Sequence, residues 1–311
     1  METEGESMRV ASIDMGSNSF LLLVAEVSKS GAIDKVLHDE CVITRLGEGV
    51  DRTGKFNEVA LKRAQECLQK YATKIEQFGV DKVQAVSTSA ARDVLNKDEF
   101  FEIGEKLSIP IVVISGENEA QLTYMGTVEN PKEKNLIVDV GGGSTEVVWN
   151  EFNGELNRFS FDIGAVRLTE RFISGHPIEP SELKKSELYI ESILDPIKAT
   201  PLSPERVYAV AGTPTTLACL IKNHVFNTEI VQGMEVTLET TEHWIEKLSA
   251  LNIEQRLSLE GLKKQPGRAD VVVCGLQCLA GTLRALGISE YVVSTRGVRY
   301  GLAKKMAMDT H

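Results

Sequence analysis

Short apolar segments and amphipathic segments alternate along the first half of the chain. The apolar stretch at 10–27 is interrupted by a polar turn at 14–19, which is typical of a strand, a turn and a second strand. Apolar residues recur at helical spacing from 61 to 78, and Gly79 follows as a helix stop. The expected strands of this half lie at 10–27, 40–45, 82–87 and 109–114, and the expected helices at 61–78 and 98–107. This order predicts an α/β domain.

The second half opens in the same way. Residues 13–17 match residues 138–142, 125 positions later, because each segment is an apolar strand that ends in Asp-x-Gly. Chance similarity between two hairpins is the alternative, but the order of elements also matches, and we therefore expect a duplicated domain. The expected strands are 135–140, 145–149, 158–162, 206–211 and 291–294, and the expected helices 166–172, 180–194, 215–222, 268–286 and 298–308. Two such domains facing one another would place two glycine-rich turns across a single cleft.

Length and charge narrow the class of protein. A chain of 311 residues accommodates two domains, and its net charge of −11 argues against a nucleic-acid binder, so no DNA partner is expected. No apolar run approaches the roughly 18 residues that a membrane helix needs, and the polar, acidic start differs from a secretory signal. We therefore expect a soluble, cytoplasmic protein with no membrane partner. The five cysteines, which include no C-x-x-C pair, are interpreted as reduced core thiols.

Two turns are candidates for phosphate binding. Gly141, Gly142, Gly143 and Ser144 follow a strand, and successive glycine N–H groups form a concave nest for anionic oxygen. The matching turn at 16–19 adds the hydroxyl of Ser17 and the amide of Asn18. Tight hairpins also favour glycine, so each turn alone is weak evidence. The presence of two, each preceded by an aspartate at a strand end, favours phosphate binding.

Carboxylates accompany both turns. Asp139 and Glu146 flank the second turn, and a hairpin would bring them to the same rim, where they suit Mg²⁺ that also binds substrate phosphate. Asp14 holds the corresponding strand end before the first turn and is a further candidate metal ligand. The alternative is that these acids merely cap turns.

The junction between the halves carries further acids, and an arginine follows an earlier strand end. Glu117 and Glu119 open an expected helix, where acids often only complement the helix dipole. One of the two could instead orient and deprotonate a water molecule, because domain junctions line clefts. Arg92 follows another strand end and could clamp a phosphate, with a surface salt bridge as the alternative.

A third candidate anion site lies at the helix that follows strand 206–211. Gly212 and Thr213 begin that helix, and a helix N-terminus with flanking hydroxyls binds anions, although it could be an ordinary cap. The densest basic run of the second half is Lys263, Lys264 and Arg268, which we interpret as a solvated helix face rather than a guide for a polyanion.

Four motifs together resemble the exopolyphosphatase/guanosine pentaphosphate phosphohydrolase (Ppx/GppA) family. They are residues 14–20, 115–120, 138–146 and 212–216, and they stand in the family's order and approximate spacing. The resemblance covers about 9–305. It implies an α/β fold of two ribonuclease-H-like domains with an interdomain cleft, as in the actin-like ATPase, sugar kinase and heat-shock-70 superfamily.

The resemblance also implies the domain limits and the reaction. Domain I is expected at 1–124 together with the C-terminal helix at about 297–311, which packs back onto it in this family, and domain II at 125–296. The implied reaction is hydrolysis of the terminal phosphoanhydride of polyphosphate or guanosine pentaphosphate with Mg²⁺, or Mn²⁺ as an alternative metal. A homodimer is a further expectation from the family.

Residue roles carry over by position in the motifs. By this resemblance Glu119 is the catalytic base, and Asp139 and Glu146 are catalytic acids that bind metal and position water. The implied phosphate cradle consists of Ser17, Asn18, Arg92, Gly141, Gly142, Gly143, Ser144 and Thr213. Longer family members carry an additional helical C-terminal region; this chain stops at His311 and resembles the short form. The His38-Asp39 pair, out of place for that region, is interpreted as a turn.

Two other functions stay open on the sequence. A kinase of the same superfold usually carries a Gly-Gly adenosine motif in its second domain, and residues 211–213 read Ala-Gly-Thr instead. A sensor that binds guanosine tetra- or pentaphosphate without turnover is disfavoured by the intact acids Glu119, Asp139 and Glu146.

Overall fold

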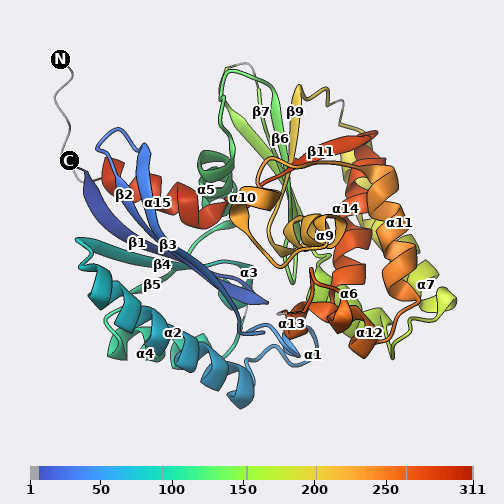
Figure 1. Ribbon diagram of the computed structural model, residues 1–311, viewed down its shortest axis with the longest axis horizontal. Coiled ribbons are helices and arrows are strands. Elements are labelled where there is room, and N and C mark those ends of the chain that lie inside the picture. The colour runs from blue at the N-terminus through green and yellow to red at the C-terminus, as the bar shows by residue number, and fades with distance from the viewer. Residues whose placement is uncertain (1–6, 93, 152, 201, 264, 310–311) are drawn as a thin grey trace. The chain divides into compact units, whose positions relative to one another are not determined.

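The chain folds into two compact units. The computed structural model describes residues 7–309 apart from positions 93, 152, 201 and 264. Unit 1 comprises Met1–Gly126 and Arg296–His311, and unit 2 comprises Thr127–Thr295. Each unit contains one mixed sheet with helices packed against it (Figure 1).

Unit 1 has a five-stranded sheet in the order β3-β2-β1-β4-β5. The first three strands form an antiparallel meander, whereas β4 and β5 run parallel to β1. The strands are β1 (Met8–Met15), β2 (Ser19–Val27), β3 (Ile33–Ile43), β4 (Lys82–Ser87) and β5 (Ile111–Val113). The polar turn between β1 and β2 therefore lies at the same sheet edge as the carboxyl ends of β4 and β5.

Helices cover both faces of the unit 1 sheet. Leu61, Leu68 and Phe100 on α2 and α4 form one apolar core with the sheet. Leu302 and Met306 on the C-terminal helix form another core on residues of β1 and β2. The helices are α1 (Val50–Thr53), α2 (Glu58–Phe78), α3 (Ser89–Arg92), α4 (Lys97–Lys106), α5 (Gly116–Thr127) and α15 (Val298–Met308).

Unit 2 has a six-stranded sheet in the order β10-β11-β9-β6-β7-β8. Its strands are β6 (Asn135–Val140), β7 (Thr145–Asn150), β8 (Leu156–Phe161), β9 (Arg206–Val210), β10 (Glu235–Thr237) and β11 (Glu290–Val293). Strands β6, β7 and β8 form an antiparallel meander, and β9 and β11 continue it in parallel with β6. This order reproduces that of unit 1, with β10 added at the edge. The predicted duplication of an α/β domain is thus confirmed.

One helix organises the core of unit 2. Every residue of α14 from Val272 to Leu283 is buried, and the helix packs against α6, α7, α9 and α11. The helices of this unit are α6 (Ala165–Phe172), α7 (Pro180–Ile193), α8 (Asp195–Lys198), α9 (Gly212–Lys222), α10 (Thr228–Val231), α11 (Leu238–Ser249), α12 (Ile253–Ser258), α13 (Pro266–Ala269) and α14 (Val272–Leu286). Among the described residues, no helix combines the length and the apolar character that a membrane crossing requires.

Two predictions about the limits of strands and helices were wrong. The third strand begins at Ile33, so that His38 and Asp39 lie inside β3 and not in a turn; Asp39 accepts two hydrogen bonds from Arg299, each 2.9 Å long. The single helix expected over 268–286 is divided into α13 and α14, and at the break the Ala269 carbonyl accepts a hydrogen bond from the Arg256 side chain.

The thiols follow the prediction in part. The cysteines are unbridged, and four of them are buried, but Cys41 is exposed on β3. Burial raises the pKa of the Cys67 thiol to about 12 and that of Cys219 to about 11. These two thiols are therefore protonated at neutral pH.

Candidate active site

The glycine turn of unit 2, residues 141–144, joins β6 to β7. It is closed by a hydrogen bond from the Gly141 N–H to the Ser144 carbonyl, 2.9 Å long. The carbonyls of Gly141 and Gly142 accept hydrogen bonds from the N–H groups of Ala165 and Val166 in the first turn of α6. The C=O and N–H of a trans peptide point in opposite directions. Anchoring these carbonyls on α6 therefore directs the next two N–H groups toward the other side of the turn, as an anion nest requires.

The close approach of α6 to this turn depends on a glycine. Gly164 precedes α6, and a Cβ placed on it would lie 2.6 Å from the Gly142 carbonyl oxygen. Since that separation is shorter than real Cβ contacts, any larger residue would push α6 away from the turn.

Asp139 and Glu146 stand directly opposite each other in the β6–β7 ladder. Residues in that relationship project from the same face of the sheet. The two carboxylates are therefore neighbours beside the turn, as expected from the sequence. The Ser160 hydroxyl on β8 donates to Oε1 of Glu146 over 2.9 Å and orients it.

The donor set beside the glycine turn fits Mg²⁺. Within the described residues no group of three or more His, Cys, Asp or Glu side chains forms a metal cluster. Mg²⁺ commonly uses only one or two carboxylates and takes its remaining ligands from water and substrate phosphate. The cross-strand pair of Asp139 and Glu146 matches that requirement.

The corresponding turn of unit 1 is built differently. Gly16 N–H donates to the Ser19 carbonyl over 3.0 Å and closes the turn. The carbonyl of Asn18 accepts the N–H groups of Thr44 and Arg45, so the loop after β3 fixes the turn from one side. Asn18 is buried, and its Oδ1 has no hydrogen-bond partner among the described residues. A buried amide oxygen without a partner is expected to meet water or a ligand group.

Asp14 differs from its counterpart Asp139. Its partner across the ladder is Leu21, whereas that of Asp139 is Glu146. Burial raises the pKa of Asp14 to about 6, and the nearby Arg299 guanidinium opposes part of that rise. In the β1–β2 ladder no carboxylate therefore stands opposite Asp14. The role of Asp14 as a metal ligand stays a prediction.

Glu119 lies in the first turn of α5 and is buried, whereas Glu117 is exposed. Arg92 on α3 donates from Nη2 to Oε2 of Glu119 over 2.7 Å. Strands β4 and β5 are parallel neighbours, and α3 and α5 follow their carboxyl ends, which explains how the two side chains meet. Burial and this contact distinguish Glu119 from Glu117 by geometry.

The helix that carries Glu119 is fixed by α15. Each of these helices contributes a glycine at the crossing: a Cβ on Gly126 would overlap the Gly297 carbonyl, and one on Gly301 would overlap the Leu122 carbonyl. The Lys304 ammonium also donates to the Met125 carbonyl over 2.6 Å. The backbones of α5 and α15 are therefore in direct contact.

The third predicted anion site lies at the start of α9. Thr213 is buried, and the preceding Ala211 has φ 74° and ψ −164°, a conformation that is essentially restricted to glycine. The Arg268 guanidinium lies against the backbone of Gly212. Arg268 therefore contacts this turn and is not on a solvated face; Lys263 is exposed and pairs with Glu260, and Lys264 lies outside the described residues.

Sequence reasoning missed several side chains that interact with these turns or with the acids beside them. They are Arg167 beside the glycine turn, Ser160 beside Glu146 and Arg299 near Asp14. Each comes from a strand or helix other than the one that carries its partner. No local pattern marks such contacts, because they arise only when the strands pair and the helices pack on the sheet.

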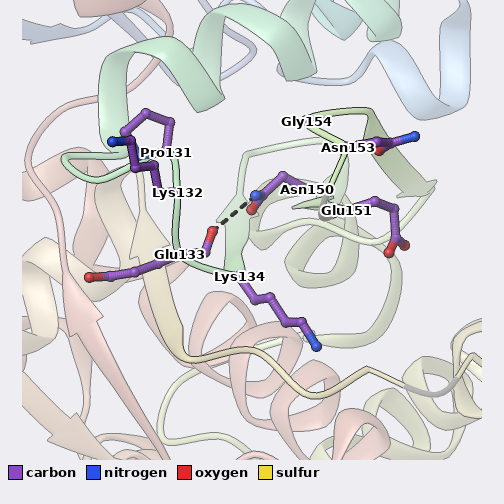
Figure 2. Close-up of a pocket in the computed structure, with 8 residues that line it drawn as sticks. All are labelled: Pro131, Lys132, Glu133, Lys134, Asn150, Glu151, Asn153 and Gly154. Carbon is purple, nitrogen blue, oxygen red and sulfur yellow. Dashed lines mark hydrogen bonds between the residues drawn. The ribbon is translucent and has the colours of Figure 1, made fainter.

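A surface pocket of about 320 Å³ lies at the other end of the β6–β7 hairpin. Glu133 and Lys134 precede β6, and Asn150 ends β7 and donates to the Glu133 carbonyl over 2.9 Å (Figure 2). None of the predicted site residues lines this pocket, because the glycine turn joins the opposite ends of these two strands.

Two units with the same strand order, each with an aspartate and a polar turn at the end of its first strand, define an actin-like fold. The profile of the Ppx/GppA phosphatase family matches residues 23–310, and the chain belongs to this family. It is accordingly an enzyme, a hydrolase that acts on phosphoanhydrides.

Relatives and solved structures agree with this assignment. The chain is 35% identical over 318 residues to exopolyphosphatase 2 of Mycobacterium tuberculosis, covering 96% of this chain and 98% of that protein. It is 27% identical to the crystal structure of an exopolyphosphatase from Cytophaga hutchinsonii, with a TM-score of 0.85 over 96% of this chain and 97% of the other. The Aquifex aeolicus member of the Ppx/GppA family is 28% identical, with a TM-score of 0.78 over 98% and 99%.

Proposed function

We propose that this protein is a Mg²⁺-dependent exopolyphosphatase that hydrolyses the terminal phosphoanhydride of inorganic polyphosphate and releases orthophosphate. The observation that carries the proposal is the β6–β7 hairpin, in which the glycine turn stands next to the cross-strand pair of Asp139 and Glu146. Backbone N–H groups bind phosphate oxygen, and paired carboxylates suit the Mg²⁺ that accompanies a polyphosphate. The relative named exopolyphosphatase 2 supports the choice of substrate.

Glu119 is the proposed base. It accepts a proton from a water molecule as the water oxygen forms a bond to the terminal phosphorus. The bond from that phosphorus to the bridging oxygen breaks, and the shortened chain leaves with the electron pair. Arg92 holds the Glu119 carboxylate for this step through their 2.7 Å hydrogen bond.

Charge neutralisation and positioning contribute most of the acceleration in phosphoryl transfer. The N–H groups of the glycine turn, with Ser17, Asn18 and Thr213, are proposed to hold the phosphate oxygens. When bound, Mg²⁺ would offset negative charge on those oxygens.

Phosphate release by the purified protein tests the proposal. Long-chain polyphosphate, guanosine pentaphosphate and ATP are compared with Mg²⁺, using wild type, Glu119→Gln and the exposed neighbour Glu117→Gln as the matched control. We expect release from polyphosphate, a kcat lower by about 10²–10⁴-fold in Glu119→Gln, as for loss of a general base, and a wild-type rate in Glu117→Gln. A near-normal rate in Glu119→Gln would refute the assignment of the base.

The products formed from guanosine pentaphosphate and ATP distinguish this function from the alternatives. Release from guanosine pentaphosphate alone would make the protein a guanosine pentaphosphate phosphohydrolase. Tight binding of that nucleotide without release would identify a sensor, and a phosphorylated acceptor formed from ATP would identify a kinase.

A further inference from the structure

Arg167 on α6 contacts the glycine turn through its side chain. Its Nε donates a hydrogen bond to the Gly143 carbonyl over 2.7 Å. The Arg167 side chain is 25% exposed, and its Nη2 lies 3.5 Å from Oδ1 of Asp162, whose side chain is 84% exposed. The contact with the turn is thus sheltered, whereas the ion pair with Asp162 is open to solvent.

With this bond, three successive carbonyls of the glycine turn accept hydrogen bonds from α6. The carbonyl of Gly141 accepts the N–H of Ala165, and the carbonyl of Gly142 accepts the N–H groups of Val166 and Arg167. The Gly143 carbonyl is the third in succession to be anchored on α6, and here the donor is the Arg167 side chain. Since each carbonyl faces α6, the N–H groups of the same three peptides, those of residues 142, 143 and 144, face away from it together.

Three successive glycines make such an anchor necessary. Glycine backbones populate many conformations, so peptide groups in a glycine run rotate easily unless something holds them. A nest binds anions well only when its N–H groups already converge. The planar guanidinium suits this task, because its donors have fixed directions, whereas a lysine ammonium is a single rotatable point charge.

We propose that Arg167 is a positioning residue for the anion-binding turn, which fixes the peptide between Gly143 and Ser144 so that its N–H faces the phosphate. The inference rests on the proposed function only in taking the glycine turn as the place where substrate phosphate binds. Arg167 acts here through the peptide and needs no contact with the substrate.

Three variants of the full chain test this role. Arg167→Met keeps the length of the side chain but removes its donors. Arg167→Lys keeps the charge but lacks the Nε–H group, and Asp162→Asn removes only the exposed ion pair. The measurements are the affinity for inorganic phosphate by calorimetry, KM and kcat with polyphosphate, and the melting temperature.

Loss of one oriented peptide donor is expected to weaken phosphate binding about five- to tenfold in Arg167→Met. KM should rise by the same factor, and Arg167→Lys should resemble Arg167→Met. Asp162→Asn should match wild type within about twofold, because an exposed ion pair contributes little.

Wild-type phosphate affinity in Arg167→Met, with only a lower melting temperature, would overturn the proposal, because it would leave Arg167 a purely structural role. Wild-type affinity in Arg167→Lys would also overturn it and would indicate that charge alone matters. The Arg167→Lys result decides the question if Arg167→Met does not fold.

Failure of the wild type to hydrolyse polyphosphate would reject the proposed function, while the phosphate-binding comparison would still decide the role of Arg167. Wild-type protein that binds no phosphate would reject the anion site and this role with it.

Discussion

Arg92 donates a hydrogen bond from Nη2 to Oε2 of Glu119 over 2.7 Å, and the side chains are 30% and 10% exposed respectively. The sequence offered two separate uses for these residues, a phosphate clamp and a base. The structure instead joins them in one hydrogen-bonded ion pair, in which the arginine orients the carboxylate of the proposed base.

Removing the arginine should therefore impair the base. We expect Arg92→Met to lower kcat about ten- to a hundredfold, the range for losing a hydrogen bond to a charged group, and Arg92→Lys to lose less. The decisive measurement is kcat of the double variant Arg92→Met/Glu119→Gln. If the two residues act as a pair, the double variant should be scarcely slower than Glu119→Gln. If the fold-losses in kcat of the two single variants multiply in the double variant, Arg92 and Glu119 act independently.

Metal dependence should reside mainly in the unit 2 hairpin. Chelation with EDTA should abolish phosphate release, and added Mg²⁺ should restore it. Asp139→Asn and Glu146→Gln should each raise the Mg²⁺ concentration for half-maximal activity by about tenfold or more, as for a lost metal contact. Asp14→Asn should raise this Mg²⁺ concentration less, because Leu21 and not a carboxylate lies opposite Asp14. An equally large rise in Asp14→Asn would show that both hairpins contribute equally to metal binding.

Ala211 offers a test of backbone strain. Its φ of 74° and ψ of −164° are tolerated by glycine and disfavoured for residues with a Cβ. Ala211→Gly should therefore raise the free energy of unfolding by about 1 kcal/mol, the strain relieved less the entropy that a glycine adds to the unfolded chain. Urea denaturation measures this, with Ala209→Gly in β9 as the control that should destabilise. A loss of stability in Ala211→Gly would contradict the argument.

His176 should make stability depend on pH. Burial, and then the Arg256 guanidinium, lower the pKa of His176 from its ordinary value of 6.5. The folded protein therefore favours the neutral ring. The resulting stabilisation is present above the unfolded pKa near 6.5 and is lost as the pH falls through the lower folded pKa.

Unfolding measured between pH 7.5 and pH 5 checks this effect. Wild type should lose stability over that range, and His176→Gln should lose less. The exposed His243→Gln serves as the control and should follow wild type. Parallel curves for all three proteins would mean that His176 does not contribute.

The hairpins could be predicted from the sequence because their signals are local. The strands 82–87 and 135–140 and the helix 298–308 have the predicted limits, since their runs of apolar residues mark them directly. β3 was shortened in the prediction because Asp34, Lys35 and His38 interrupt its apolar pattern; the strand exists through pairing with β2. Such pairing is a property of the folded chain.

The features of the candidate site also fall into two groups, those that the local sequence indicates and those that depend on contacts in the folded chain. The register that sets Asp139 opposite Glu146 follows from a tight hairpin, which the sequence indicates. The choice of Glu119 over Glu117 depended on the family resemblance, and only burial and Arg92 supply a physical reason for it. Arg167 is invisible to such reasoning, because its partner lies 24 residues away on another element.

The place of α15 in unit 1 has a consequence for how the protein is made. Residues 298–308 cover the face of the sheet formed by Val10, Leu23 and Val27, and they pack directly on the helix that carries Glu119. During translation, residues 1–126 leave the ribosome long before this helix exists, with that apolar face uncovered. The whole of unit 2 is synthesised in the interval. Unit 1 can be completed only after unit 2 has been synthesised, so a nascent chain that is interrupted before residues 298–308 should leave the helix that carries Glu119 without this packing partner and should expose an apolar surface for chaperones to bind.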